Sequence, residues 1–119
     1  MVIAAAIRVW PGGKIYIGHS HAEARSSATQ DGKSRFEVNS AEHGFMTDNG
    51  DFLNRVQSYI NAVISGQLAA SKELVETFKE YEEFAFLDYD IPELDSEMIN
   101  FTEEQIVRAK EFSESKEKS

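Results

Sequence analysis

Cysteine is absent from this sequence, and proline and tryptophan are scarce, with two prolines and one tryptophan in 119 residues. Without thiols the chain forms no disulfide bond and offers no thiolate ligand to a metal ion. A hydrophobic run long enough to span a membrane is also missing, because Arg8 and Pro11 interrupt the apolar residues that open the sequence. These absences favour a small domain in a reducing cytoplasm, with neither a signal peptide nor a membrane partner.

Basic residues are few, and acids outnumber them in only one part of the chain. Residues 1–70 contain six acids, six bases and all three histidines, whereas residues 71–119 contain 15 acids and six bases. The formal net charge of -9 therefore comes from the second part. A net-acidic chain without a basic run is a poor candidate for binding duplex nucleic acid through its phosphates. A small anionic ligand is still compatible with the sequence if the bases of the first part converge.

Residues 41–67 carry the clearest structural pattern. Residues 45–53 consist of two short apolar segments around an Asp-Asn-Gly-Asp turn, which predicts a β-hairpin. Asn54 and Gln57 then form a capping box at the start of a helix, and Gly66 suits the end of that helix. The apolar residues of this helix recur at the spacing of one buried face: Val56, Tyr59, Ile60, Val63 and Ile64.

The residues before this stretch predict further strands and a helix. Residues 2–10 are almost continuously apolar, as in a buried strand, and residues 14–17 follow a Pro-Gly-Gly turn and complete a first hairpin. Ser20 and Glu23 suit the first turn of a helix at residues 20–30. Three alanines would let this helix lie close to a sheet: Ala22, Ala24 and Ala28. Residues 35–38 alternate polar and apolar side chains, which indicates either a short strand or an extended segment that leads into residues 41–67.

The acidic second part predicts two helices separated by a loop. An amphipathic helix begins at Ser71 and continues to residue 85, and residues 88–97 contain a proline and read as a linker. A second capping box, Thr102 with Gln105, opens a short helix, while residues 113–119 are polar and read as a frayed end. The contact face expected for this last helix is Ile106, Val107 and Phe112.

The predicted fold class is therefore α+β, with a small antiparallel sheet, helices packed on it and acidic helical segments at the C-terminal end. We expect residues 1–87 to form a ligand-binding domain and residues 88–119 to form an acidic linker and short helix. A domain of this size buries only about two-thirds of its unfolded surface, so assembly into a dimer or higher homo-oligomer is expected to supplement its stability.

Three short motifs in a fixed order resemble a known family. The sequence reads Gly-Phe-Met-Thr at residues 44–47, Phe-Leu-Asn-Arg at 52–55 and Gly-Gln at 66–67, after a strand that ends in glycine and histidine at residues 14–19. This order resembles the phage-encoded anti-Thoeris sponge proteins, which sequester cyclic ADP-ribose signals and in some cases cyclic oligonucleotides. The likeness covers roughly residues 3–67 with a gap. Two features depart from the family pattern: Asp51 stands where a basic or polar residue is usual, and the family's tail motif is not recognisable after Gln67.

The resemblance implies a pocket between protomers in which Phe45 stacks on a base while Asn54 and Arg55 make polar contacts. Phe45 equally suits a core aromatic, and Asn54 a helix N-cap. Arg55, in the first helical turn, could hold a pyrophosphate or form a surface ion pair with Asp51 or Glu42.

Other polar residues complete the candidate binding set. His43 and Thr47 lie near the same junction in the sequence. Arg8 interrupts an apolar strand and therefore faces either a polar cleft or an exposed sheet surface. Lys14, Arg25 and Arg35 are weaker candidates for ligand binding, and a solvated charge is the simpler interpretation of each.

His19 and His21 are two residues apart, a spacing that on a strand places both side chains on one face, as metal sites require. His43 could serve as a third ligand. However, the pair falls at a predicted junction between a strand and a helix, and no metalloprotease motif accompanies it, so ligand binding is the simpler interpretation. The sequence also lacks a nucleophile-elbow serine and a glycine-rich phosphate loop. We therefore expect no catalytic residues, no metal and no cofactor.

The function expected from the sequence is sequestration of a cyclic nucleotide immune signal, without cleavage, in the cytoplasm of an infected bacterial host. Two alternatives stay open. The acidic second part could bind a host defence protein and inhibit it. Alternatively, the histidines could serve a nucleotide hydrolase.

Overall fold

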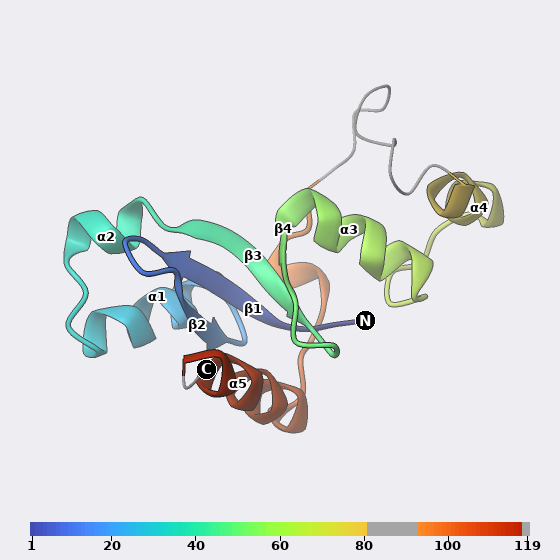
Figure 1. Cartoon of the computed structure of the whole chain (residues 1–119). Helices are drawn as coiled ribbons and strands as arrows, with labels where there is room; N and C mark the ends of the chain where they lie inside the picture. The colour runs from blue at the N-terminus through green and yellow to red at the C-terminus, as the bar shows by residue number, and fades with distance from the viewer. Residues whose placement is uncertain (81–92, 118–119) are drawn as a thin grey trace.

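A computed structural model describes residues 1–80 and 93–117 of the chain. Figure 1 shows an antiparallel sheet with the strand order β2-β1-β3-β4. The strands are β1 (Val2–Val9), β2 (Lys14–Gly18), β3 (Glu42–Thr47) and β4 (Phe52–Asn54). The helices are α1 (His21–Gln30), α2 (Arg35–Asn39), α3 (Arg55–Ile64), α4 (Lys72–Glu80) and α5 (Glu103–Glu117), with a 3₁₀ turn at Ser96–Met98. The predicted α+β class is confirmed.

The first hairpin joins β1 to β2 through the predicted Pro-Gly-Gly turn. Gly12 and Gly13 have φ angles of 98° and 72°, which only glycine adopts without strain. The backbone N–H of Gly13 donates to the carbonyl of Val9 at 3.0 Å and closes the turn. Val9 then pairs with Lys14 and the register continues to the pair Ala5 and Gly18, so β2 forms one edge of the sheet.

The second hairpin and the helix after it also form as predicted. β3 and β4 pair antiparallel, with Phe45 opposite Leu53. A methyl group on Gly44 would lie 2.1 Å from the carbonyl oxygen of Leu53, so only glycine allows the two strands to approach this closely. Asn54 and Gln57 form the expected capping box, and Gly66 follows the helix with a φ of 81°. In the predicted apolar face, Ile60 and Val63 are buried while Val56, Tyr59 and Ile64 pack against them.

Two helical layers cover the sheet. On the first face, α1 and α2 bury a cluster that consists of Ile7, Val9, Tyr16, Ala24, Ala28, Val38 and Ala41. Ala22 of the same helix is exposed, so two of the three predicted alanines contact the sheet. On the second face, α5 packs on β1 and β2 and contributes Ile106 and Ala109 to the main core. We call these two faces the α1 face and the α5 face.

The residues at 35–38 form a helix, so the prediction of a strand there is wrong. Ser34 and Glu37 form a complete capping box: the Ser34 hydroxyl accepts from the N–H of Glu37, and the Glu37 carboxylate accepts from the N–H of Ser34. This local pair favours a helical turn over the extended conformation that the alternating pattern suggested. Val38 alone of this short helix is buried.

The C-terminal segment belongs to the same core as the sheet, in contrast to the expected linker and short helix. Leu94, Phe101, Ile106 and Ala109 are buried in one cluster with Val2. Residues 113–119 were expected to be a frayed end. This prediction is wrong for residues 113–117, because α5 continues to Glu117 and Ser113 is buried. Val107, predicted as a contact residue, is 52% exposed. The boundary at residue 87 and the expected extension of α4 to residue 85 lie outside the described residues.

Within the described part of the chain, no helix has the length and apolar character needed to cross a bilayer.

Candidate functional site

Four nitrogen-bearing side chains converge on the α1 face, near the middle of β3. His21 and Arg25 lie one turn apart on α1, His43 lies on β3, and Arg55 begins α3. The imidazole rings of His21 and His43 have centroids 5.2 Å apart, and a guanidinium nitrogen of Arg25 lies 3.3 Å from Nε2 of His43. All four residues are partly exposed. We call this set the cationic cluster.

His21 is fixed on the sheet by a backbone hydrogen bond. Its Nε2 lies 2.8 Å from the carbonyl oxygen of Gly44, and because a carbonyl only accepts, Nε2 is the protonated nitrogen. In the neutral ring Nδ1 is then the unprotonated nitrogen. Burial lowers the pKa of His21, and the nearby positive groups of His43, Arg55 and Arg25 lower it further, against the opposing effect of the Gly44 hydrogen bond.

His43 lies in a similar electrostatic environment. Burial is the main cause that lowers its pKa, and Arg25 and Arg55 add to the effect. Arg25 donates to Nε2 of His43, so this nitrogen is unprotonated in the described arrangement. In the described residues Arg25 forms no ion pair, which leaves its charge available to a ligand.

Arg55 joins α3 to the C-terminal segment. Its Nε donates to the carbonyl oxygen of Leu94 at 3.0 Å, and one guanidinium nitrogen lies 2.9 Å from a carboxylate oxygen of Glu93. The N–H of Leu94 in turn donates to the carbonyl oxygen of Arg55 at 2.9 Å. Arg55 thus forms a surface ion pair, but the expected partners, Asp51 or Glu42, are wrong, because the carboxylate that it meets is that of Glu93. Because Arg55 and Glu93 are 38 residues apart, local sequence patterns do not predict this contact.

Phe45 is a core residue, so the implied stacking of its ring on a base is wrong for this structure. Its side chain has no exposed surface. The ring contacts the edge of His21, with 4.9 Å between centroids, and lies 6.2 Å from the ring of Phe101. Phe45 therefore supports the cationic cluster from beneath.

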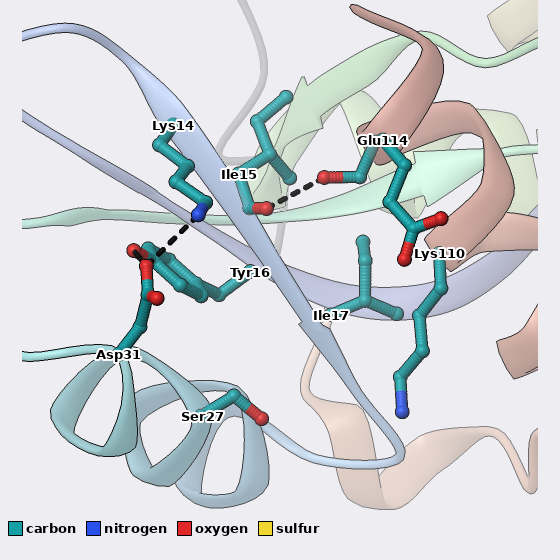
Figure 2. A pocket seen from close by; sticks show the side chains of 9 residues that line it. Lys14, Ile15, Tyr16, Ile17, Ser27, Asp31, Lys110 and Glu114 are labelled. Atoms are coloured by element: carbon teal, nitrogen blue, oxygen red, sulfur yellow. Dashed lines mark hydrogen bonds and ion pairs between the residues drawn. The ribbon is translucent and has the colours of Figure 1, made fainter. Parts of the chain in front are cut away.

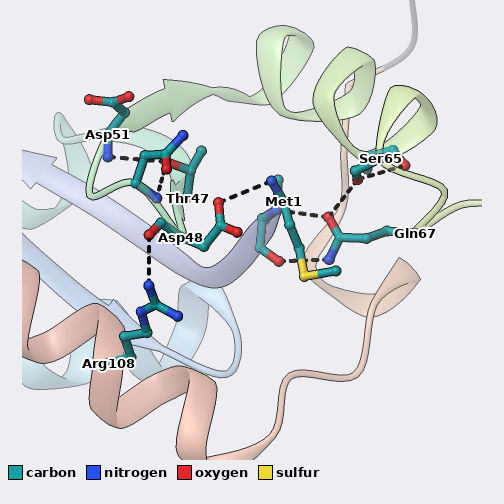
Figure 3. A network of polar contacts seen from close by, with 10 residues as sticks. Met1, Thr47, Asp48, Asp51, Ser65, Gln67 and Arg108 are labelled. Carbon is teal, nitrogen blue, oxygen red and sulfur yellow. Dashed lines mark hydrogen bonds and ion pairs between the residues drawn. The ribbon is translucent and has the colours of Figure 1, made fainter.

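Thr47 is also unavailable to a ligand. It is 4% exposed, and its hydroxyl accepts from the N–H groups of Asn49 and Asp51 at 3.3 and 3.1 Å. These bonds hold the turn between β3 and β4 (Figure 3).

Asn54 serves as the N-cap of α3. Its side-chain oxygen accepts from the N–H of Gln57 at 2.8 Å, and the Gln57 side chain accepts from the N–H of Asn54 at 3.0 Å. The residue is exposed, but its acceptor oxygen is committed to the helix. Of the two roles that the sequence left open, the structure shows the cap.

Arg8 lies on the opposite face from the cationic cluster, so the structure does not bring it into the candidate site. Its guanidinium lies 2.9 Å from a carboxylate oxygen of Glu42 and 4.6 Å from the centroid of the Phe52 ring. Trp10 donates its indole N–H to the same carboxylate at 2.6 Å. Both hydrogen bonds lower the pKa of Glu42, and the one from Arg8 has the larger effect. Arg8 is therefore largely neutralised by a neighbour on its own face.

His19 points away from His21, because β2 ends at Gly18 and the two histidines do not share a strand. Its Nδ1 lies 3.0 Å from a carboxylate oxygen of Glu23, and its Nε2 lies 3.0 Å from Glu103 at the start of α5. The hydrogen bond to Glu23 is the main cause that raises the pKa of His19. In residues 1–80 and 93–117, no three histidine or carboxylate side chains gather as metal ligands would.

Gly66 and Gln67, the last residues of the motif set, have structural roles. Gly66 adopts a positive φ just after α3. The Gln67 amide donates to the carbonyl oxygen of Val2 and accepts from the N–H of Val2, both at 2.7 Å (Figure 3). The side chain of Gln67 thus pairs with the start of β1 as a neighbouring strand would.

No family model matches this chain, and comparisons with curated proteins and with solved structures found no significant match.

From the sequence Arg25 was only a weaker candidate, for which a solvated charge was favoured, so it was left out of the predicted site. The signal was present, because residues four apart in a predicted helix lie on the same face, and Arg25 follows His21 by four. Of the predicted site residues, His21, His43 and Arg55 are brought together. His19, Thr47, Asn54 and Arg8 have other partners.

Proposed function

We propose that this protein binds a small phosphate-bearing ligand at the cationic cluster. The observation that carries the proposal is the convergence of the Arg25 guanidinium, which has no carboxylate partner in the described residues, with the imidazoles of His21 and His43 on one partly exposed surface. The Arg55 guanidinium lies beside them and is already paired with Glu93, so its contribution is secondary. Arginine is well suited to phosphate because its planar donors bind two oxygens at once. Histidine adds a donor that becomes charged when an anion binds next to it.

Protonation of the histidines is part of the proposed binding. Burial and the arginines favour the neutral imidazoles in the free protein. A bound phosphate offsets the positive charges of Arg25 and Arg55, so it favours uptake of protons by His21 and His43. Affinity is therefore expected to increase as the pH falls from 7.5 to 6.

The resemblance to the anti-Thoeris sponge proteins suggests the identity of the ligand. We propose a cyclic nucleotide signal, a cyclic ADP-ribose isomer or a cyclic oligonucleotide, that is held without cleavage in the cytoplasm of an infected bacterial host. Because Phe45 is buried, the partly exposed rings of His21 and His43 take its place as the surface against which a base can pack.

A second protomer is proposed to complete the pocket. Nanomolar affinity corresponds to about -12 kcal/mol, which small ligands reach when most of their surface is buried. The cationic cluster is only partly buried in one chain. A homo-oligomer that covers it would supply the remaining contact surface.

The proposal is tested with cyclic ADP-ribose isomers and cyclic di- and trinucleotides. Each is mixed with the protein, the shift in melting temperature is measured, and the mixture is then boiled and analysed by chromatography. Sequestration predicts a large shift with one ligand class and recovery of intact nucleotide. A chelator-sensitive loss of nucleotide would instead support the hydrolase, and no shift with any member of the panel would contradict a nucleotide ligand.

One observation favours a second candidate, inhibition of a basic host protein by α5. The outer surface of this helix borders a shallow hollow of about 450 Å³, lined by Glu103, Glu104, Val107, Arg108 and Glu111. Removing residues 88–119 cannot test this, because Leu94 and Phe101 belong to the core. The double variant Glu104→Gln with Glu111→Gln keeps the fold and removes two charges. Loss of inhibition in this variant, with inhibition retained in Arg25→Gln, would favour the protein partner.

A further inference from the structure

A groove runs along the free edge of the sheet, away from the cationic cluster. β2 pairs with β1 on one side, and its other side faces a hollow of about 280 Å³ between α1 and α5. Figure 2 shows the strand as the floor, with α1 and α5 as the two walls. The lining residues are Lys14, Ile15, Tyr16, Ile17, Ser27, Asp31, Lys110, Ser113 and Glu114.

The backbone of β2 presents hydrogen-bonding groups to this groove. The hydroxyl of Ser113 donates to the carbonyl oxygen of Ile15 at 2.7 Å, so this carbonyl points away from β1. Because backbone groups alternate in direction along an antiparallel strand, those of Ile17 point the same way, whereas those of Tyr16 face β1. Within the described residues, the Ser113 bond is the one hydrogen bond found to these outward groups. They match the pattern that a further strand requires.

The walls add charges of both signs. Asp31, which follows the last residue of α1, is engaged by Lys14 at 2.8 Å and by the Tyr16 hydroxyl. On α1 itself, the Ser27 hydroxyl has no hydrogen bond in the described residues. On α5, Lys110 and Glu114 line the groove, and neither forms an ion pair within residues 1–80 and 93–117. This wall therefore offers one positive and one negative group to an occupant.

We propose that the groove binds an extended peptide segment, which adds to β2 as a further strand. Its backbone would pair with the outward groups of Ile15 and Ile17, as in other cases of strand addition. A carbonyl has two lone pairs, so Ile15 accepts a peptide N–H while it keeps the Ser113 bond.

The spacing of the wall charges determines which peptide fits. Lys110 and Glu114 are four residues apart on a helix, a rise of about 6 Å. Residues two apart on a strand are separated by about 6.7 Å and point to the same side. The fitting peptide therefore carries an acidic and a basic side chain two positions apart, facing α5.

A second copy of the chain is a poorer occupant than a free peptide. The edge of β2 lies between two helices, and a second β2 would bring its own α1 and α5 into the same space. A single extended segment has no such walls. The groove is also at the small end of the range for ligand pockets, which suits a short segment.

The test uses the capped pentapeptide acetyl-Thr-Glu-Val-Lys-Thr-amide and its neutral analogue with both charged residues replaced by glutamine. The peptides are titrated into ¹⁵N-labelled protein, and amide shifts and amide hydrogen exchange are recorded. We expect saturable shifts along β2, slower exchange at Ile15 and Ile17, and at least about fivefold tighter binding of the charged peptide than of its analogue. The double variant Lys110→Gln with Glu114→Gln should bind both peptides equally.

Ile15→Pro removes the outward N–H without removing a bond to β1, and Ile15→Ala is its matched control because it shortens the side chain and keeps that N–H. The proline variant should lose at least about tenfold in peptide affinity relative to the alanine variant. The proposal is overturned by equal binding to these two variants, by shifts outside the groove, or by no binding at millimolar peptide. It is also overturned if sedimentation shows an oligomer that Ile15→Pro dissociates and Ile15→Ala does not, because a second copy of the chain would then occupy the β2 edge.

Discussion

Neighbouring residues of β3 face opposite layers of the molecule and meet different electrostatic surroundings. On the α5 face, Glu42 forms an ion pair with Arg8 and accepts a hydrogen bond from Trp10. On the α1 face, His43 lies against Arg25, which has no carboxylate partner in the described residues. The comparison shows that an arginine beside a strand is not in itself a ligand site. What matters is whether a carboxylate on the same face already neutralises it.

The largest expected effect is a loss of stability when Phe45, which lies beneath the cationic cluster, is truncated. Phe45→Ala should lower the free energy of unfolding by about 3 to 5 kcal/mol, because it removes a fully buried ring between His21 and Phe101. Phe36→Ala is the matched control, since Phe36 is 81% exposed and its loss should change stability by no more than about 0.5 kcal/mol. Both values are measured by urea unfolding. A stability loss below 1 kcal/mol in Phe45→Ala would mean that the ring is not part of the core.

The next prediction concerns ligand affinity after replacement of one arginine from each face, Arg25 and Arg8. Arg25→Gln should weaken binding of cyclic ADP-ribose at least about tenfold, or about 1.4 kcal/mol, because it removes a charge that no carboxylate neutralises. Arg8→Gln should leave affinity unchanged and lower stability by at most about 1 kcal/mol, because the ion pair that it breaks is partly exposed. Calorimetric titration and urea unfolding measure the two quantities. Equal losses of affinity in both variants would remove the distinction between the faces.

A smaller effect is expected at the junction between β4 and α3. Asn54→Ala should lower the free energy of unfolding by about 1 kcal/mol, because the cap of α3 is lost. Asn54→Ser retains a side-chain acceptor and should recover most of this loss. If Asn54→Ala instead keeps its stability and loses ligand affinity, the residue contacts the ligand rather than the helix.

The smallest effect is the pH dependence of stability. A histidine whose pKa is lowered by folding binds fewer protons in the folded state, so His21 and His43 should reduce stability as the pH falls from 7 through 6.5 toward their lowered pKa values. His19 has a raised pKa and acts in the opposite sense, adding stability below pH 6.5 that is lost as the pH rises. Its side chain is 35% exposed, so this contribution is weak.

Urea unfolding of the wild type and of His21→Gln at pH 7.5 and 5.5 measures this dependence. The variant should lose less stability on acidification than the wild type, and His19→Gln, the control, should lose more. A greater loss in His21→Gln would show that the imidazole is charged in the folded protein.

Local signals in the sequence were sufficient for most of the fold. The Pro-Gly-Gly turn, the hairpin around Asn49 and Gly50, and the Asn54 cap each depend on residues close together in the chain, and all form as predicted. The prediction for residues 35–38 was wrong because an alternating pattern over four residues is a weaker signal than the capping box next to it.

The site was harder to predict because it depends on contacts between distant segments. Arg55 meets Glu93 and Leu94, and Phe45 is covered by Phe101. Nothing within either local segment indicates these pairs. The acidic composition of residues 71–119 also concealed the apolar residues that place this segment in the core.

The motif set that carries the family resemblance consists largely of residues with structural roles. Gly44 permits close approach of two strands, Asn54 caps α3, and Gln67 pairs with the start of β1. Such residues are more informative about how the hairpin and helix fold than about which ligand is bound. Ligand identity therefore rests on the cationic cluster and on the binding panel.

The most direct test of the central claim is NMR titration of the three imidazoles with and without cyclic ADP-ribose. The proposed binding mode predicts that the ligand raises the pKa of His21 and the pKa of His43. The pKa of His19 should not change, because His19 is engaged by Glu23 and Glu103. A ligand that changes only the pKa of His19, or that leaves all three pKa values unchanged, would contradict a ligand site at the cationic cluster.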